Sequence, residues 1–464
     1  MRLFFVALLS LSSVANASAL DGSYLNLSWG IPFAMILLFI ALGGVLIPKL
    51  WHHHYGKITL AWTLLFLVPF SIFFGGETTL HVVAHALIEE YIPFILLLLA
   101  LYTVSGGILI WGTLNGTPAT NTKLLAIGTL LSSLMGTTGA AMLMIRPLLR
   151  ANGYRKHRVH TVVFFIFLVA NIGGGLTPLG DPPLFLGFLK GVTFGWTVKH
   201  MLVPVLLSSV ILLIAFYFID NHFYRQDGEI LPHEKEPPAK IKIFGKGNFL
   251  LLIGIVGTVL LSGIWRSGAS FTILGTTVTL EAVTRDCLLI VITLISLWLT
   301  PNPVRAGNEF NFEPIIEVAK LFAGIFITIA PVLAMLQAGE QGPFKFLLTM
   351  AHNNNNEPIN AIYFWLTGIL SSFLDNAPTY LVFFNMASGN ADYLMSTGAS
   401  TLMAISMGAV FMGAMTYIGN APNFMVRSIA KAQRVEMPSF FGYVLWSVAI
   451  LGPLFLLHTL IFFW

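Results

Sequence analysis

The sequence predicts an all-α polytopic membrane protein, and three observations support this prediction. Of its 464 residues, 56% are hydrophobic and only 9% are charged, whereas soluble domains carry about 25% charged residues. The mean hydropathy is +0.83. The 42 glycines and 23 prolines exceed what plain spanning helices need, so we expect some helices to be broken. This composition excludes a soluble fold, and we expect no enzymatic activity.

The N-terminus has the pattern of a bacterial signal peptide over residues 1–19. Arg2 supplies the positive start, Leu3–Leu11 the apolar core, and either Ala15-Asn16-Ala17 or Ala17-Ser18-Ala19 a small-residue cleavage site. The alternative is an uncleaved first span. Both readings place residues near Asp21 outside the membrane.

Ten apolar segments are long enough to cross a bilayer. Two more, 123–150 and 359–388, have a polar, Gly/Pro-rich centre, so we expect re-entrant hairpins that enter and leave on one side. The polar stretch 220–248 is predicted to be a cytoplasmic linker between an N-terminal half, 20–219, and a C-terminal half, 249–464. The predicted spans are 30–48, 57–75, 91–113, 161–190, 200–219, 249–264, 284–300, 318–338, 399–426 and 439–463.

The distribution of basic residues predicts the topology. If neither hairpin crosses, 18 of the 24 Lys and Arg residues fall on the cytoplasmic side and five outside. We therefore expect a multi-pass protein of the bacterial inner membrane, with the mature N-terminus and the C-terminus in the periplasm. The net charge of +4 records this topology, so lipid is the expected partner and nucleic acid is not.

An internal repeat relates the two halves. Residues 131–140 (LSSLMGTTGA) match 370–379 (LSSFLDNAPT), and 176–185 (LTPLGDPPLF) match 415–424 (MTYIGNAPNF), both at an offset of 239. Each half then holds five transmembrane helices and one re-entrant hairpin, and the odd number makes the halves run in opposite directions. This inverted-topology repeat is typical of secondary transporters, which bind substrate and ions near the midplane at broken helices.

The broken helices are predicted within 161–190 and 399–426. Unwinding at such breaks frees carbonyls that can coordinate a small cation such as Na⁺, and it creates helix N-termini that suit an anion. A structural kink is the alternative. The candidate binding residues at the breaks are Thr177, Gly180, Asp181, Thr416, Asn420 and Asn423.

Asp181 and Asp375 are the most informative single residues. A carboxylate within an apolar segment is costly and indicates function by default. One carboxyl group can hold either a proton or a metal ion, which is the minimal chemistry of exchange. At the repeat offset Asp181 matches Asn420, and Asp375 matches Gly136. The alternative is that each Asp only caps the following helix.

The hairpin tips add hydroxyl and amide groups at Thr137, Thr138, Asn376 and Thr379, and the threonines could ligate Na⁺. Arg146 has three readings: it could pair with a buried Asp, contact a carboxylate substrate, or extend to the cytoplasmic surface.

At these motifs the sequence resembles the ion transporter superfamily, which includes divalent-anion/sodium symporters, arsenite permeases, citrate–metal transporters and NhaD-type sodium/proton antiporters. Dicarboxylate carriers have Ser-Asn-Thr at their hairpin tips, where this chain has Gly136-Thr137-Thr138 and Asp375-Asn376-Ala377. The NhaD-type patterns T-P-x-G-D and D-N-x-P are similar to Thr177–Asp181 and Asp375–Pro378. The motifs also fit sequences labelled as citrate transporters. The resemblance covers most of residues 30–463 and implies a scaffold, a mobile transport part and a homodimer.

Two functions follow as hypotheses. The favoured one is Na⁺(Li⁺)/H⁺ antiport, with Na⁺ held at Asp181, Asp375 and unwound backbone. The alternative is cation-coupled transport of citrate or a dicarboxylate, and an arsenite-type permease is a smaller possibility. No cofactor is expected beyond Na⁺ and H⁺ as transported or coupling ions.

Overall fold

The computed structural model describes residues 20–112, 114–228, 241–353, 355 and 357–464. The predicted signal peptide, 1–19, and residues 229–240 of the predicted linker lie outside the described residues. Two predicted spans are shorter apolar helices, Leu27–Gly43 and Ala399–Met415. The all-α polytopic prediction is confirmed, because eight described stretches are long and apolar enough to span a membrane: His53–Phe74, Gly76–Ser105, Val159–Leu176, Phe194–Gln226, Gly247–Ile264, Leu280–Leu299, Glu313–Gln337 and Phe440–Phe462.

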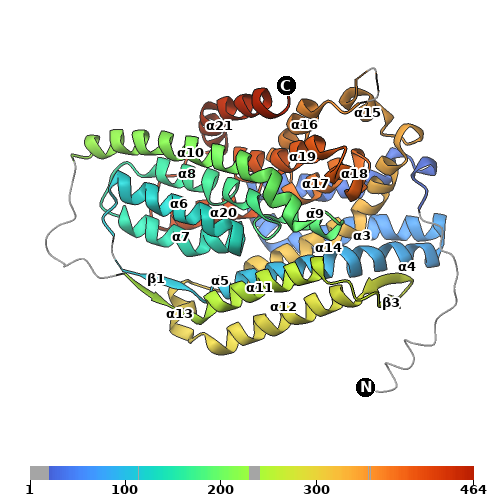
Figure 1. Cartoon of the computed structure of the whole chain (residues 1–464), viewed down its shortest axis with the longest axis horizontal. Coiled ribbons are helices and arrows are strands. Elements are labelled where there is room, and N and C mark those ends of the chain that lie inside the picture. Colours follow the sequence, from blue (N-terminus) through green and yellow to red (C-terminus); the bar gives the residue numbers. More distant parts are fainter. Residues whose placement is uncertain (1–19, 113, 229–240, 354, 356) are drawn as a thin grey trace.

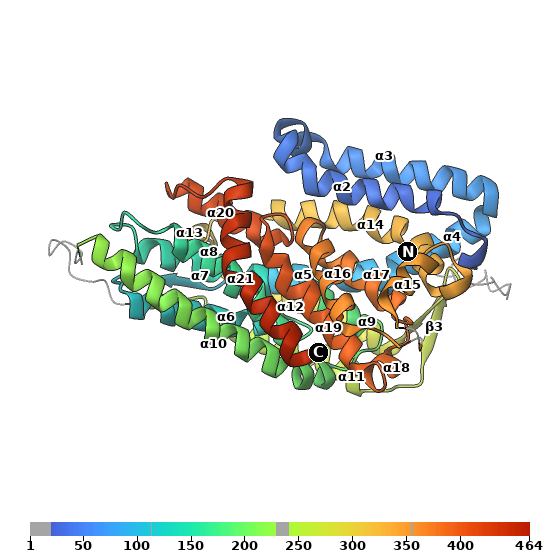
Figure 2. The same ribbon diagram turned by 90° about the horizontal axis from the view of Figure 1, so that it is seen from above.

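Three helices form one side of the molecule, as Figure 2 shows: α2 (Ile31–Leu46) and α3 (Pro48–Phe74) lie along α14 (Glu313–Gln337). The chain then passes through α4 (Gly76–His85) and a π-helical segment, η3 (Ala86–Tyr91). Helix α5 (Ile92–Ser105) follows and packs against α11 (Gly247–Ile264) and α12 (Leu280–Leu299), and the short helix α13 (Asn302–Gly307) comes after α12.

The first predicted hairpin consists of α6 (Pro118–Met135) and α7 (Thr137–Ala151), joined by one residue, Gly136. The φ of Gly136 is +78°, a conformation that favours glycine because other residues place Cβ against the carbonyl oxygen. At the base, Asn121 and Asn152 exchange side-chain hydrogen bonds of 2.9 and 2.8 Å. The start of α6 and the end of α7 therefore lie next to each other.

The second hairpin consists of α16 (Asn360–Phe373) and α17 (Asn376–Met386). Leu374 and Asp375 form its turn, and Asp375 is the N-cap of α17.

The two predicted breaks are present. The first separates α8 (Val159–Leu168), a 3-10 turn η4 (Ile172–Leu176) and α9 (Pro182–Leu189). The second separates α19 (Ala399–Met412), η6 (Gly413–Met415) and α20 (Ala421–Ala432). Both α9 and α20 restart at a proline in the first turn, where the missing N–H costs no helical hydrogen bond.

The predicted linker 220–248 is wrong at both ends. Helix α10 (Phe194–Gln226) continues past residue 220, and β2 (Lys242–Phe244) pairs antiparallel with β1 (Leu109–Trp111). The other elements are η1 (Gly22–Tyr24), η2 (Leu27–Gly30), β3 (Ser270–Ile273), β4 (Thr276–Thr279), η5 (Gly339–Gln341), α15 (Lys345–Ala351), α18 (Ala391–Met395) and α21 (Phe440–Phe462).

Hydrogen bonds between hairpins and breaks recur at the repeat offset. The Thr177 hydroxyl donates to the Ser133 carbonyl, and 239 residues later Thr416 donates to the Ser372 carbonyl, both at 2.5 Å. The Ser133 hydroxyl donates to the Gly173 carbonyl, and its counterpart Ser372 donates to Met412 at 2.9 Å. The sequence match is thus accompanied by a match in local geometry.

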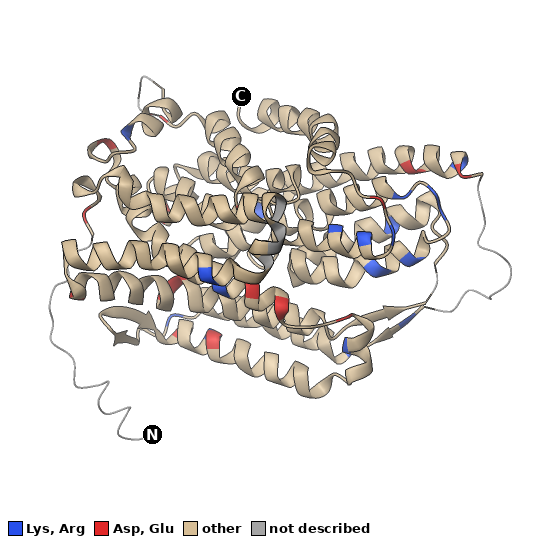
Figure 3. Cartoon of the chain, turned by 180° about the vertical axis from the view of Figure 1, so that it is seen from behind, with Lys and Arg blue, Asp and Glu red and all other residues tan. Residues whose placement is uncertain are grey.

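The elongated molecule has two ends, named here by their helices. The α13 end carries α13, β1 and the end of α10, and the α18 end carries α18 and the β3–β4 hairpin (Figures 1 and 2). Most Lys and Arg residues gather toward the α13 end (Figure 3). This end corresponds to the side that the sequence predicts as cytoplasmic.

Candidate functional site

Asp181 lies at the centre of the candidate site. It is the N-cap residue of α9 and its side chain is buried, with the residue 2% exposed. Its Oδ1 accepts hydrogen bonds from the Thr137 hydroxyl and the Asn420 amide, each at 3.0 Å. Its Oδ2 accepts one from the Asn376 amide at 2.6 Å. Among the described residues, no basic side chain forms an ion pair with Asp181.

These four residues form two pairs related by the repeat. Asn376 lies 239 positions after Thr137, and Asn420 lies 239 positions after Asp181. Each hairpin tip and each helix break therefore contributes one residue to a single cluster. The sequence prediction named all four, and the structure brings them together.

Four helices begin at this cluster. Thr137 and Asn376 are the first residues of α7 and α17, while Asp181 and Asn420 are the N-caps of α9 and α20. Each N-terminus carries a partial positive charge and unpaired N–H groups. The converging helix ends stabilise negative charge at Asp181.

The backbone at the tip of the first hairpin contacts the break directly. The Thr137 N–H donates to the Gly180 carbonyl at 2.8 Å. Gly180 allows this approach, because a Cβ there would lie 2.1 Å from the Gly174 carbonyl oxygen. Gly180 therefore sets the packing of the site.

A cavity of about 530 Å³ surrounds the cluster. Four carboxylate residues line it, namely Asp181, Asp375, Glu313 and Glu317, with one basic residue, Arg427. The cavity reaches the surface at its exposed lining residues, which are Asn311, Glu313, Ala421, Phe424 and Ser428. Its other lining comes mostly from α5, α14 and both hairpin tips.

Several predicted ligands have structural partners. Thr379 donates to the Asp375 carbonyl at 2.9 Å, and Thr177 and Thr416 hold the hairpins as described above. The Asn423 amide donates to the carbonyls of Gly413 and Thr416 at 2.8 and 2.9 Å. None of Thr177, Thr379, Thr416 and Asn423 appears in the cavity lining, whereas Thr138 does.

Asp375 lies in the cavity lining but also acts as a helix cap. Its Oδ1 accepts a hydrogen bond from the Ala377 N–H at 3.1 Å. Both readings of Asp375, as a cap and as a group facing the cavity, are therefore compatible with its position.

Arg146 does not contact the cluster. It pairs with Glu309 at 2.9 Å and is absent from the cavity lining, so an ion pair with a buried Asp is wrong. The basic residue of the cavity is Arg427, whose guanidinium lies 4.4 Å from the ring centroid of Tyr417. Sequence reasoning missed Arg427. The signal that could have found it is its spacing from Asn420, seven residues or about two helical turns.

A second buried polar cluster was also missed. Asp220 of α10 pairs with Arg155 at 2.7 Å and His160 at 2.6 Å, and its Oδ2 accepts from Asn121 at 2.9 Å. The side chains of Asp220 and Arg155 are 0% exposed. This cluster joins the base of the first hairpin to α8 and α10, away from the cavity.

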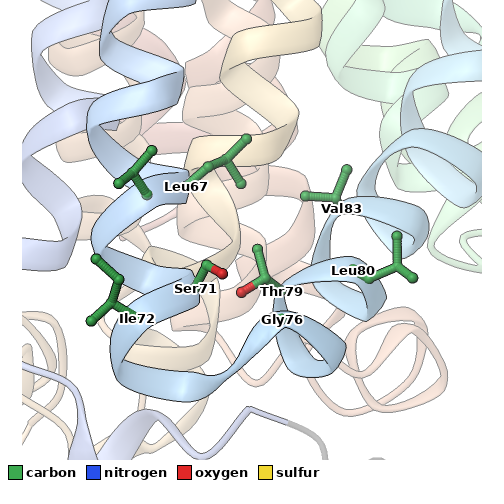
Figure 4. Close-up of a pocket in the computed structure, with 8 residues that line it drawn as sticks. Leu67, Ser71, Ile72, Gly76, Thr79, Leu80 and Val83 are labelled. Carbon is green, nitrogen blue, oxygen red and sulfur yellow. The ribbon is translucent and has the colours of Figure 1, made fainter.

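A further hollow lies between the end of α3 and α4 (Figure 4). Figure 4 shows that its labelled side chains are apolar except for the hydroxyls of Ser71 and Thr79. Its lining has no ionisable side chain, so we do not assign it to ion binding.

The comparison with protein families decides the class. A family model described as "Putative citrate transport" matches residues 22–463. The chain belongs to this family. The predicted resemblance to a citrate-transporter-like family is thus confirmed, and the citrate-transport family supports a secondary transporter. A search of curated proteins finds no match.

Proposed function

We propose that this member of the citrate-transport family exchanges Na⁺ or Li⁺ for H⁺, with Asp181 as the shared binding group. The observation that carries the proposal is the setting of Asp181, a buried carboxylate held by three neutral donors. A carboxylate with a basic partner would be neutralised internally. Asp181 has no such partner among the described residues, so a bound proton or cation is needed to compensate the part of its buried negative charge that the helix N-termini leave uncompensated.

The neighbours of Asp181 could complete a cation shell. The hydroxyl of Thr137 has lone pairs, and rotating the amide of Asn376 or Asn420 by 180° presents Oδ1 in place of Nδ2. The described residues contain no group of three His, Cys, Asp or Glu side chains suited to a metal ion. One carboxylate with neutral oxygens fits a monovalent cation better than a transition metal.

The charge of the cavity also favours cation binding. Four carboxylates face one arginine, so the lining attracts cations and repels a free polyanion. We assign the α13 end to the cytoplasm of an inner-membrane protein, consistent with the concentration of basic residues there.

The test uses inverted membrane vesicles with an imposed pH gradient, to which Na⁺, Li⁺, K⁺ or citrate is added. We expect Na⁺ and Li⁺ to collapse the gradient and K⁺ not to do so. A parent protein that shows no response to Na⁺ or Li⁺ above that of protein-free vesicles would overturn the proposal.

The second candidate is cation-coupled uptake of citrate or a similar organic anion. Two observations favour it: the family description, and Arg427 in the cavity with its Nε unpartnered among the described residues. An arginine recognises carboxylates well, and the helix N-termini would add to it. Radiolabelled citrate uptake that is lost in Arg427→Gln while Na⁺/H⁺ exchange is absent from the parent would favour this function.

A further inference from the structure

Two ion pairs join the site-bearing elements to the rest of the molecule at opposite ends. Lys190, the residue after α9, pairs with Glu90 of η3. Arg146, near the end of α7, pairs with Glu309, which lies two residues beyond α13. Helices α7 and α9 both begin at the Asp181 cluster.

The Glu90–Lys190 pair lies toward the α18 end. Beyond Lys190, the Thr193 N–H contacts the sulfur of Met395 at 3.2 Å, and the Trp196 indole donates to the Met395 carbonyl at 3.1 Å. Met395 is the last residue of α18. The β4 strand packs against η3, the segment that carries Glu90.

The pair is well shielded from water. The Glu90 side chain is 7% exposed and that of Lys190 26%. By contrast, the Glu309 side chain is 71% exposed. A shielded pair is screened weakly by salt and resists separation, whereas an exposed pair contributes little.

The cavity opens only away from this pair, as far as the described residues show. Its exposed lining residues come from the segment after α13, the start of α14 and the helix α20, and neither Glu90 nor Lys190 lines it. None of these exposed residues belongs to η3, α9 or α18, the elements around the Glu90–Lys190 pair.

We propose that Glu90–Lys190 is an ionic latch that keeps the α18 end closed and separates when the cavity opens there. This inference rests on the proposed carrier function, which requires access from both sides in turn. Helix α9 links the latch to the site: it spans eight residues from Asp181 to Lys190, about 12 Å at 1.5 Å per residue. A shift of α9 that accompanies cation or proton binding at Asp181 moves Lys190 directly. The π-helical segment that carries Glu90 is a form often found at functional positions.

The test measures accessibility, not transport. Thr138→Cys, which lines the cavity, is introduced into a Cys287→Ser background, since Cys287 is exposed. A membrane-impermeant thiol reagent is applied to each face of vesicles of known orientation. Exposed Asn353→Cys and Lys156→Cys report the two faces separately.

With the latch intact, we expect labelling of the Thr138→Cys probe mainly from the Lys156 face. Glu90→Gln should raise labelling from the Asn353 face about tenfold, as expected when one charge pair biases a two-state equilibrium. Lys190→Met should do the same, and the exchange Glu90→Lys with Lys190→Glu should restore the parent rate to within about twofold. Glu309→Gln is the matched control and should not raise labelling from the Asn353 face.

The latch is wrong if both Glu90→Gln and Lys190→Met leave labelling from the Asn353 face unchanged in folded protein, or if Glu309→Gln raises it equally. A shift in labelling without Na⁺-driven proton movement supports the latch and removes the antiport proposal. Na⁺-driven proton movement in the parent, without a shift in labelling in the latch variants, supports the antiport proposal and removes the latch.

Discussion

Asn420 donates a hydrogen bond of 3.0 Å to Asp181, the residue that it matches 239 positions earlier in the chain. Two equivalent positions of an internal repeat are thus in direct contact, one charged and one neutral. The contact places the cluster where the two halves meet. The site is therefore symmetric in position and asymmetric in charge, and this asymmetry can be tested by mutation.

Asp181→Asn should abolish coupled exchange. The substitution keeps the shape of the side chain but removes the charge that holds a cation, so we expect the rate of Na⁺-driven proton movement to fall by about 100-fold or more. The measurement is gradient collapse in vesicles with matched amounts of folded protein. Asp375→Asn is the comparison, and a smaller loss there would indicate that Asp375 acts mainly as the cap of α17. Exchange at the parent rate in Asp181→Asn would exclude Asp181 as the shared group.

Exchanging the two equivalent residues should recover activity. In the double variant Asp181→Asn with Asn420→Asp, the carboxylate moves to the N-cap of α20 and its neutral partner to the N-cap of α9. Because helix N-termini and amide donors remain around it, we expect the double variant to exchange Na⁺ at least about tenfold faster than Asp181→Asn. A double variant as inactive as Asp181→Asn would show that the two positions are not interchangeable.

The repeat made much of the site predictable from the sequence. The offset of 239 identified both hairpin tips and both breaks, because each half needs Gly, Pro, Thr and Asn to form a tight hairpin turn and to interrupt a helix. It could not show that Asn376 contacts Asp181, since the partners lie 195 residues apart and no local pattern relates them. The hypothesis that Asp181 and Asp375 both hold the cation stays a prediction, because the cap hydrogen bond of Asp375 is compatible with both readings of that residue.

The missed residues share a physical cause. Asp220 is the first residue of the predicted linker 220–248, and Arg427 is the first residue after the predicted span 399–426, because charge density alone does not show where a helix ends. Helix α10 continues past Asp220 to Gln226. Asp220 has buried partners in Arg155 and His160, which lie 65 and 60 positions away in the chain. Long-range partners of this kind are visible only in the folded structure.

Gly180→Ala should disrupt the site through packing alone. A Cβ at residue 180 would lie 2.1 Å from the Gly174 carbonyl oxygen, a backbone atom that cannot move without shifting the break. We expect exchange activity to be lost even though no charged group is altered. Gly452→Ala is the matched control, because a Cβ there meets nothing within 4 Å and activity should be unchanged. Parental activity in Gly180→Ala would show that the break can adjust.

Asp220→Asn should affect stability and not ion selectivity. Among the described residues, the substitution leaves the buried guanidinium of Arg155 with Asp227 as its one acidic partner, whose carboxylate lies 3.6 Å from its Nε. Removing one partner of a buried ion pair costs about 3–5 kcal/mol of unfolding free energy, and Asp227 should hold the loss near the lower value. Thermal unfolding in detergent should therefore shift by several degrees, whereas exposed Asp392→Asn should cause no shift. The Na⁺ concentration for half-maximal exchange should not change in either variant, because neither residue lines the cavity. A change in that concentration in Asp220→Asn, with unfolding unaltered, would instead connect this cluster to the transport site.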